Sequence, residues 1–494
     1  MLKKKNILSI ISVGFLLFAV EARAQFAEDV LRLSLFNSGI GARSLGMGNA
    51  GVGLADDYSA LFQNPAGLAS LRDYEFSMGI SQLGYKNDVG FLGSNTESNL
   101  NALNLNNLGL VYPIATVRGS LTFAVGFGRV ANYTTTASYD GFNARSSIIE
   151  ALASPFNIYS MSEEDVDRLL TDNIPYQVWL ADIDSSSGLF FPIVTDSVQQ
   201  SGIVEEGGGL NNWSFGGAID VSRNLAVGVS INFLSGSYQY DREYTEIDLR
   251  DVYTYQNRFD AFDRFTYIST IDGDITGFNA LFGVMFRKQG LFKIGATIRT
   301  PTVYEIEETF SDYGESVFDP INGIVDRFDK EVSGKTKYEV KTPPVLSAGA
   351  SLQVGDWLVL AGDAEYTDWT QMEFVTNNSD LEAENRFIKR IFEPTTNLRG
   401  GAEVTLWDVG VILRAGVAWN PSPYKDDPPE FDQISFTGGV GLRLDEKLFL
   451  NSAFSLGKWT TFRDNYYVPG ISNASRTNED VQRSNVNVTL SYRF

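Results

Sequence analysis

Apolar side chains recur at every second position through most of this chain. In residues 74–80 the even positions hold Tyr, Phe, Met and Ile, and in residues 121–127 the odd positions hold Leu, Phe, Val and Phe. The same alternation occurs in residues 213–221, 225–233, 278–286, 292–298, 411–419, 434–444 and 486–494. A period of two predicts β-strands with one apolar face. After residue 25 no window of 18 residues is entirely apolar, so the sequence excludes membrane-spanning helices.

The links between these strands alternate between short and long. Short links lie at 117–119, 222–224, 288–290, 355–356, 407–408 and 445–447. Long polar segments lie at about 86–102, 136–209, 248–263, 307–336, 371–389, 420–432 and 458–480. Six short turns and seven long loops join fourteen strands, an arrangement typical of outer-membrane barrels with periplasmic turns. We therefore predict an all-β fold, a 14-stranded antiparallel transmembrane β-barrel whose largest extracellular loop covers residues 136–209.

The two ends of the chain predict export to the outer membrane. Three lysines at 3–5 precede an apolar run over 7–20 and then Ala22-Arg23-Ala24, a pattern typical of a cleaved secretory signal peptide over residues 1–24. The apolar run is shorter than the roughly 20 residues of a membrane-spanning helix, which disfavours an anchor. The last strand ends on Phe494, which resembles the signal read by the outer-membrane assembly machinery. We expect that machinery and outer-membrane lipid as partners, and the cell outer membrane as the location.

Residues 37–70 differ from both the strands and a linker. Six glycines lie between Gly39 and Gly53, yet apolar residues occur throughout, so the segment can bend tightly and still needs burial. We predict that residues 25–73 form a compact N-terminal plug, or hatch, inside the lumen of a barrel formed by residues 74–494. Two interpretations of Asn64, Pro65, Ala66 and Gly67 stay open. These residues form either a structural turn that fixes the plug in place or a gating element whose fit controls opening.

The composition excludes several classes of function. The formal net charge of −22 argues against a nucleic-acid partner, because the phosphate backbone is also negative. The chain contains no cysteine and no histidine, which removes Ser-His and Cys-His nucleophiles and the commonest metal ligands. No paired-carboxylate motif stands out among the scattered Asp and Glu residues. We therefore expect no enzymatic activity, no cofactor and no metal site.

Strand parity predicts which charged side chains face the lumen. If the apolar residues of 292–298 face lipid, then Arg299 points inward, and the same argument turns Arg399, Glu403 and Arg414 inward. An arginine facing lipid at mid-depth would cost roughly 2–4 kcal/mol. With a turn at 407–408, residue 414 lies opposite about 401, so Arg399, Glu403 and Arg414 should be near one another. The arginines either form a self-neutralising ion cluster, or Arg299, Arg399 or Arg414 keeps spare donors for a fatty carboxylate.

The loop at 136–209 has polar ends and an apolar middle. Three interpretations stay open: a small lid that packs on itself, a groove that captures hydrocarbon, and a docking face for a partner protein. The residues that would form a capture surface are Ile148, Ile149, Leu152, Trp179, Phe190 and Phe191.

Several stretches resemble the FadL/TodX family of outer-membrane hydrocarbon and long-chain fatty-acid transporters. They are Gly41-Ala42-Arg43, Gly46-Met47-Gly48, Ala55-Asp56-Asp57, Asn64-Pro65-Ala66-Gly67-Leu68-Ala69, Thr342-Pro343-Pro344, Asp363-Ala364-Glu365-Tyr366-Thr367-Asp368-Trp369, Leu413-Arg414-Ala415-Gly416 and Asn420-Pro421-Ser422-Pro423. The resemblance implies that outer loops catch a hydrophobic ligand, which enters an apolar pocket in the lumen. It leaves when the hatch shifts, with a sideways exit through the barrel wall as one route.

The resemblance predicts a passive transporter of long-chain fatty acids or other hydrophobic compounds, and we expect a monomer by default. The hatch motif also resembles PorV-type barrels of type 9 secretion, so an adaptor that captures secreted proteins is the alternative. A polar porin is disfavoured, because a plug would obstruct a water-filled lumen.

Overall fold

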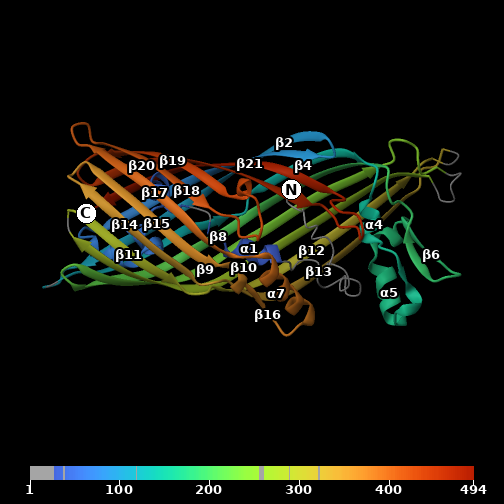
Figure 1. Cartoon of the computed structure of the whole chain (residues 1–494), viewed down its shortest axis with the longest axis horizontal. Helices are drawn as coiled ribbons and strands as arrows, with labels where there is room; N and C mark the ends of the chain where they lie inside the picture. The colour runs from blue at the N-terminus through green and yellow to red at the C-terminus, as the bar shows by residue number, and fades with distance from the viewer. Residues whose placement is uncertain (1–26, 37–38, 118, 255–260, 289, 321–322) are drawn as a thin grey trace, which may run out of the picture.

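The computed structural model describes residues 27–36, 39–117, 119–254, 261–288, 290–320 and 323–494. The signal peptide expected over residues 1–24 lies outside the described residues. The described chain forms a closed antiparallel β-barrel of 14 strands, as the alternation predicts (Figure 1). Pairing of the last strand with the first closes the barrel, with Phe76 opposite Tyr492.

Ten strands of the barrel are continuous. They are β1 (Glu75–Phe91), β2 (Ser94–Ile114), β8 (Val198–Ser222), β9 (Leu225–Ile247), β10 (Phe262–Lys288), β17 (Pro394–Leu406), β18 (Val411–Asn420), β19 (Gln433–Arg443), β20 (Leu448–Asp464) and β21 (Arg476–Arg493). The other four strands are each interrupted and consist of two segments. These are β3 (Leu121–Asn132) with β4 (Thr135–Asn143), β11 (Phe292–Arg299) with β12 (Val303–Phe318), β13 (Arg327–Lys341) with β14 (Val345–Val354), and β15 (Leu358–Asp368) with β16 (Glu373–Val375).

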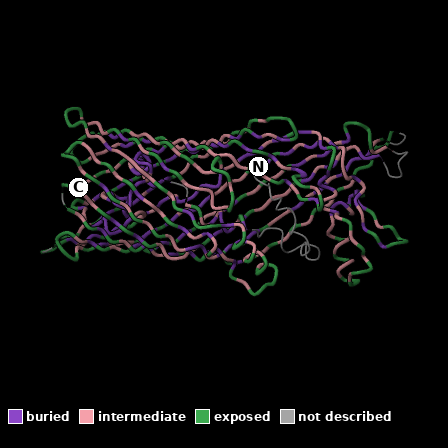
Figure 2. The backbone as a smooth tube through the Cα atoms, viewed as in Figure 1, coloured by how far each residue is buried: buried purple, intermediate pink, exposed green. Residues whose placement is uncertain are grey.

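Lipid-facing side chains occupy the end of the barrel that carries the short turns. On β1 the outward residues Phe76, Met78 and Ile80 are exposed, whereas Lys86 and Asp88 lie further along the same face. Buried and exposed residues alternate along the strands in Figure 2. The C-terminus lies at the turn end, and helices α4 and α5 lie at the opposite end (Figure 1). An apolar belt next to short turns is the pattern expected of an outer-membrane barrel.

Several of the long loops expected from the sequence are extended hairpins instead. Residues 86–102 belong almost entirely to β1 and β2, which meet at a tight turn of Leu92 and Gly93. Similarly, β12 and β13 occupy most of 307–336. The strands continue beyond the membrane because outward polar side chains are stable in water, so the apolar alternation ends before the strand does. Polarity therefore marks the edge of the membrane rather than the end of the strand.

The plug lies inside the barrel. It contains α1 (Ala27–Ser34), α2 (Ala42–Gly46), α3 (Ala60–Gln63) and the 3₁₀ helix η1 (Pro65–Ser70), and its apolar side chains are mostly buried. The Tyr58 hydroxyl donates a 2.8 Å hydrogen bond to the Leu108 carbonyl, beside two wall glycines, Gly109 and Gly126. The ring fits there because glycine leaves room on the inner wall for close approach.

The loop between β4 and β8 folds into a small lid of residues 144–197. It consists of α4 (Ile148–Leu152), β5 (Phe156–Asn157), η2 (Ile158–Ser160), α5 (Glu163–Asp172), α6 (Ile174–Gln177), β6 (Ala181–Asp184) and β7 (Leu189–Pro192). The lid is shorter than the loop expected over 136–209, because Thr135 pairs with Glu206 and the adjoining residues continue that ladder.

Other loops add η4 (Trp369–Gln371), α7 (Ser379–Ile391) and η5 (Pro429–Phe431). Helix α7 contacts α1 of the plug. None of the helices in the described part of the chain is long and apolar enough to cross a membrane.

Candidate functional site

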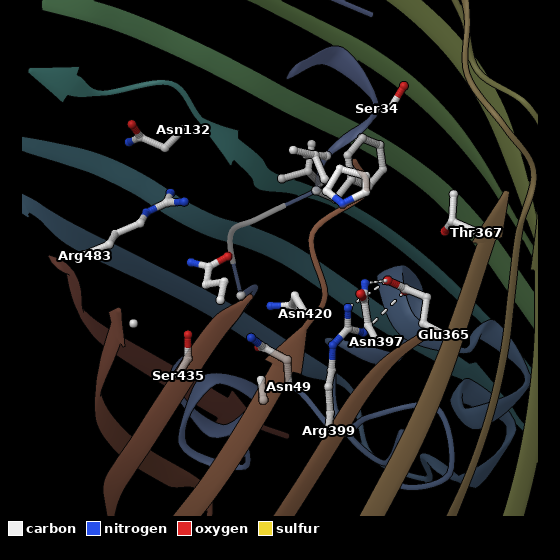
Figure 3. A pocket seen from close by; sticks show the side chains of 18 of the residues that line it. Ser34, Asn49, Asn132, Glu365, Thr367, Asn397, Arg399, Asn420, Ser435 and Arg483 are labelled. Carbon is white, nitrogen blue, oxygen red and sulfur yellow. Dashed lines mark hydrogen bonds and ion pairs between the residues drawn. The ribbon is translucent and has the colours of Figure 1, made fainter. Parts of the chain in front are cut away.

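A cavity of about 520 Å³ lies between the plug and the barrel wall (Figure 3). Its volume falls within the range of small-molecule binding sites, roughly 300–1,000 Å³. Residues from the plug and from strands on several sides of the barrel line it.

The lining of this cavity combines apolar and polar side chains. The plug side carries the apolar residues Phe36, Ile40, Leu45, Val52 and Phe62. The wall side is rich in amide and hydroxyl side chains, namely Asn132, Asn212, Asn232, Asn397, Asn420, Asn485, Thr297, Thr367, Thr437, Ser347, Ser435 and Ser455. The pocket implied by the family resemblance is therefore mixed in polarity, because the wall also contributes apolar residues such as Leu281, Val345 and Trp459. Such a cavity suits a ligand with an apolar body and polar groups.

Two of the three predicted arginines line the cavity. The Arg399 guanidinium donates to Glu365 at 2.8 and 3.3 Å, and the Asn397 amide donates to the same carboxylate at 3.1 Å (Figure 3). The Arg299 guanidinium lies 4.5 Å above the ring centre of Phe36, and no carboxylate of the described residues is within ion-pair distance of it. Asp363 lies opposite Arg399 in the sheet, so two carboxylates face the two guanidinium groups, and Arg299 is the one of the two without a direct ion pair among the described residues.

Arg414, the third arginine, lies under the plug and outside the cavity lining. Its guanidinium donates to Glu403 at 2.6 Å and to Asn451 at 2.9 Å, and the side chain is only 2% exposed. Glu403 also accepts from the plug residue Arg43 at 2.8 and 3.0 Å, and Arg43 pairs with Asp56. These groups anchor the plug to the wall with charge-assisted hydrogen bonds.

Arg399 does not join this plug anchor, although the sequence predicted that Arg399, Glu403 and Arg414 would be near one another. Glu403 lies opposite Arg414, and Arg399 lies opposite Ala418. Arg399 and Glu403 are four steps apart along the strand, about 13 Å at the usual rise. The strand of Arg399 pairs on its other side with β15, and Glu365 of β15 is the partner of Arg399.

The predicted hatch motif seats the plug on the barrel wall. Asn64 is fully buried, its side chain accepts from the Ala66 backbone N–H at 3.1 Å, and its amide donates to the Val52 carbonyl at 2.9 Å. The Asn64 amide also donates to the Val284 carbonyl of β10 at 3.3 Å. Pro65, Ala66 and Gly67 are buried in η1, which begins at this turn. The motif therefore links two parts of the plug and the wall.

The barrel wall has a break beside the cavity. The β2–β3 ladder covers only Asn107 to Ile114, and within the described strands residues 94–106 of β2 pair with β1 alone. Beyond this ladder β3 bends inward, and the Asn87 amide of β1 donates to the Thr136 carbonyl of β4 at 3.0 Å. The cavity lining includes Asn132 and Tyr133, which stand at the bend. At the base of the break, Asn106 exchanges two 2.8 Å hydrogen bonds with the plug backbone at Gly39 and Gly41.

The lid keeps most of its predicted capture residues inside. Ile148, Ile149 and Phe190 are fully buried in apolar clusters, and Leu152 and Phe191 are half-buried. Trp179 differs, since it is 63% exposed and its ring centre lies 5.9 Å from that of Phe328. The lid is thus mainly self-packed, with one exposed aromatic group from the predicted set.

Sequence reasoning missed Arg43 and Glu365 as partners of the predicted arginines. Arg43 stands out as a cation within a glycine-rich apolar segment, which is a signal for an anchoring role. Glu365 shares the inward parity of its strand, so the alternation that identified Arg399 could also have identified it. Within the described residues, no group of three or more carboxylates could hold a metal ion.

A family model described as "Outer membrane protein transport protein (OMPP1/FadL/TodX)" matches residues 210–494. No curated protein matches the chain in sequence.

Solved structures with this fold include transporters from several bacteria. A Pseudomonas aeruginosa FadL homologue aligns with 12% identity and a TM-score of 0.57, covering 93% of this chain and 100% of that one. The Pseudomonas putida toluene transporter TodX aligns with 14% identity and a TM-score of 0.53, covering 92% and 99%. The Ralstonia pickettii toluene transporter TbuX aligns with 15% identity and a TM-score of 0.50, covering 93% and 100%. At these identities the likeness concerns the fold.

Proposed function

We propose that this chain, which belongs to the outer membrane protein transport family (OMPP1/FadL/TodX), carries hydrophobic acids such as long-chain fatty acids passively across the outer membrane. As a member of this family, the chain is an outer-membrane transporter of hydrophobic compounds and not an enzyme. The family match supports this function over the secretion adaptor considered from the sequence. We also propose that the transporter is a monomer, as expected from the sequence.

The observation that carries the proposal is the Arg299 guanidinium in the lining of the cavity. Arg399 is engaged by Glu365, while Arg299 has its guanidinium on the Phe36 ring and no carboxylate partner among the described residues. A buried guanidinium binds a carboxylate in a bidentate manner and is satisfied by it. The apolar plug residues beside it suit the hydrocarbon chain of the same ligand.

The proposed exit is sideways, through the break in the wall. The break adjoins the cavity at Asn132 and Tyr133, and a hydrophobic ligand leaving there would pass toward the lipid without crossing the plug. The Asn106 bonds to the plug lie at its base, so a shift of the plug would alter the opening. We assign the gating role predicted for Asn64, Pro65, Ala66 and Gly67 to this coupling between plug and wall.

Capture at the outer surface is the proposed role of the lid. Trp179 presents an exposed ring next to Phe328 and can receive an apolar chain from the medium. We assign Ile148, Ile149 and Phe190 to support of this surface, because they pack within the lid.

The test is a comparison of an acid with its alcohol. Hexadecanoic acid and hexadecanol are titrated into amphipol-solubilised protein by calorimetry, for the wild type and for Arg299→Gln. Loss of one charged hydrogen-bonded pair should weaken hexadecanoic acid binding about 10- to 100-fold and leave hexadecanol binding unchanged. Arg327→Gln, a change of an exposed arginine, is the matched control. Equal binding of hexadecanoic acid by wild type and Arg299→Gln would reject a carboxylate site at Arg299.

A further inference from the structure

A polar patch on the cavity wall surrounds Gly457 of β20. Gly457 is opposite Ser435 of β19 in the sheet, and both residues line the cavity. A Cβ atom added to Gly457 would lie 2.8 Å from the Ser435 hydroxyl oxygen and 3.3 Å from the Gln433 amide nitrogen. The two polar atoms therefore converge on the inner side of the glycine. Because glycine has no side chain, it does not cover these atoms from the cavity.

The other members of this patch follow from the strand register. Asn420 of β18 is opposite Gln433, and Ser455 lies two residues from Gly457 on β20. Residues directly opposite in antiparallel strands have Cβ atoms about 4.5–5.5 Å apart, and a step of two residues along a strand is about 6.6 Å. Asn420, Gln433, Ser435 and Ser455 thus form one continuous surface, which we call the Gly457 patch.

The four polar side chains of the Gly457 patch are accessible from the cavity. Each is half-buried and lines the cavity, and none makes a side-chain hydrogen bond with another described residue. No polar atom of the four is completely enclosed by protein. Figure 3 shows Asn420 and Ser435 among the side chains around the cavity. A ligand in the cavity can therefore form hydrogen bonds with the patch without breaking existing ones.

An aromatic ring borders the Gly457 patch. The β19–β20 ladder pairs Ile434 with Lys458, so Gln433 and Trp459 are the next facing positions. Trp459 is half-buried and lines the cavity, and its ring centre lies 6.4 Å from that of Tyr85 at an interplanar angle of 70°. This edge-to-face contact holds the indole ring in place. The cavity wall therefore presents an aromatic ring next to amide and hydroxyl groups.

The chemistry of the patch matches a sugar. Amides and hydroxyls both donate and accept hydrogen bonds, as the hydroxyls of a sugar do, so each pair can form in either direction. The C–H face of a sugar ring is apolar and packs on the aromatic ring of Trp459. A hydrocarbon chain over the patch would displace water from the four polar side chains and leave them without partners. Arg483, which is opposite Gly457 on β21 and also lines the cavity, is a further donor at the border of the patch.

We infer that the Gly457 patch is a second binding subsite, which takes the sugar head group of a hydrophobic glycoside. The patch lies on the eleventh, twelfth and thirteenth strands of the barrel, whereas Arg299 lies on the seventh. A glycoside therefore binds at the patch without a carboxylate on Arg299. The inference goes beyond the proposed function, because it adds amphiphiles with an uncharged polar group to the hydrophobic acids.

The test compares decyl β-D-glucoside with decyl tri(ethylene glycol) ether, which has the same alkyl chain and a polar group without a sugar ring. Each is titrated into the amphipol-solubilised full-length protein by calorimetry, with amphipol alone as the blank. We expect the wild type to bind the glucoside at least about tenfold more tightly, because ether oxygens accept hydrogen bonds but do not donate them. In the double variant Gln433→Leu, Ser435→Ala this preference should fall below about twofold. The ether should still bind this variant, which shows that the barrel and cavity are intact.

The double variant Asn101→Leu, Ser452→Ala is the control, because it removes one amide and one hydroxyl from exposed positions of β2 and β20 and should keep the preference. Equal binding of the glucoside and the ether by the wild type overturns the inference, as does a preference that survives in Gln433→Leu, Ser435→Ala. Tighter binding of decyl phosphate than of the glucoside, lost in the same variant, also overturns it, because the patch would then serve an anion.

The proposed function is tested separately in Arg299→Gln. This variant should keep the glucoside preference, because Arg299 is not part of the Gly457 patch. If the preference is absent while hexadecanoic acid binding still depends on Arg299, the inference falls and the proposed function stands. If the preference is present while hexadecanoic acid binds the wild type and Arg299→Gln equally, the carboxylate site falls and the inference stands.

Discussion

Replacement of Gly228 by alanine should unseat the plug without unfolding the barrel. Gly228 lies on the inner face of β9, opposite Ala218 of β8 and Gly283 of β10. A Cβ atom added there would lie 2.5 Å from the Ala66 nitrogen and 2.6 Å from the Pro65 carbonyl oxygen. Both contacts are with backbone atoms, so no side chain can rotate to relieve them. The wall is held by ladders on both sides of β9, and the plug has to move instead.

The size of the effect follows from the overpacking. Forcing an extra methyl group into a packed site costs about 1–3 kcal/mol. If this cost falls on the seated plug alone, the ratio of displaced to seated plug rises about 5- to 150-fold. We expect Gly228→Ala to open more often than the wild type in planar lipid bilayers.

The control for this prediction is Gly438→Ala on β19. A Cβ atom added at Gly438 would have its nearest contact at 3.9 Å, the Arg414 carbonyl oxygen, which is an ordinary van der Waals distance. Both variants should show the heat-modifiable gel mobility of a folded barrel. If Gly228→Ala is folded and conducts no more than Gly438→Ala, the reasoning that η1 seats the plug against β9 is refuted.

Two further predictions concern the lid and the first helix. Glu246 accepts hydrogen bonds from the Ser147 hydroxyl at 2.5 Å and from the Ile148 backbone N–H at 2.7 Å. Glu246→Leu should therefore release the lid and speed trypsin cleavage within it at least tenfold. Glu243→Leu, a change of an exposed residue, is the control. Burial and the nearby Glu28 raise the pKa of Glu384, which accepts from the first turn of α1. The α1–α7 contact should be strongest below about pH 4.5 and weaken as the pH rises through the raised pKa. Burial also raises the pKa of Glu28, so Glu384→Gln should reduce this dependence in hydrogen exchange of residues 27–34 without abolishing it, and an unchanged pH profile in the variant would contradict the assignment.

The barrel could be predicted from the sequence because its signal is local. Each lipid-facing stretch, such as Phe76, Met78 and Ile80, carries the period of two within a few residues, and parity alone turns Arg299 inward. Register is less local. We predicted that residue 414 lies opposite about 401, whereas it pairs with Glu403, because the turn comprises residues 407–410 and not two residues. Two extra turn residues shift the pairing by two positions and keep the parity.

The candidate site could be predicted only in part, because it depends on contacts between distant segments. Arg43 and Glu403 are 360 residues apart in sequence, and nothing local to either indicates the other. The polarity of the cavity also depends on contacts between segments that are distant in the sequence. Strand parity turned charged residues such as Arg299 inward, but which inward residues the plug covers depends on the position of the plug. Asn64 was recognised as part of a motif, whereas its bond to Val284 on the wall required the structure.

The division of the cavity between plug and wall provides a route from ligand binding to plug movement. Part of the apolar surface, including Phe36 and Phe62, belongs to the plug, whereas Arg299 and Arg399 belong to strands held in place by their ladders. A ligand with its carboxylate on Arg299 and its chain on the plug loses the apolar contact whenever the plug moves away. Its binding free energy therefore differs between the two plug positions, and that difference is what allows a ligand to shift a conformational equilibrium. An apolar pocket formed by the wall alone would bind the same chain equally in both positions and could not bias the plug.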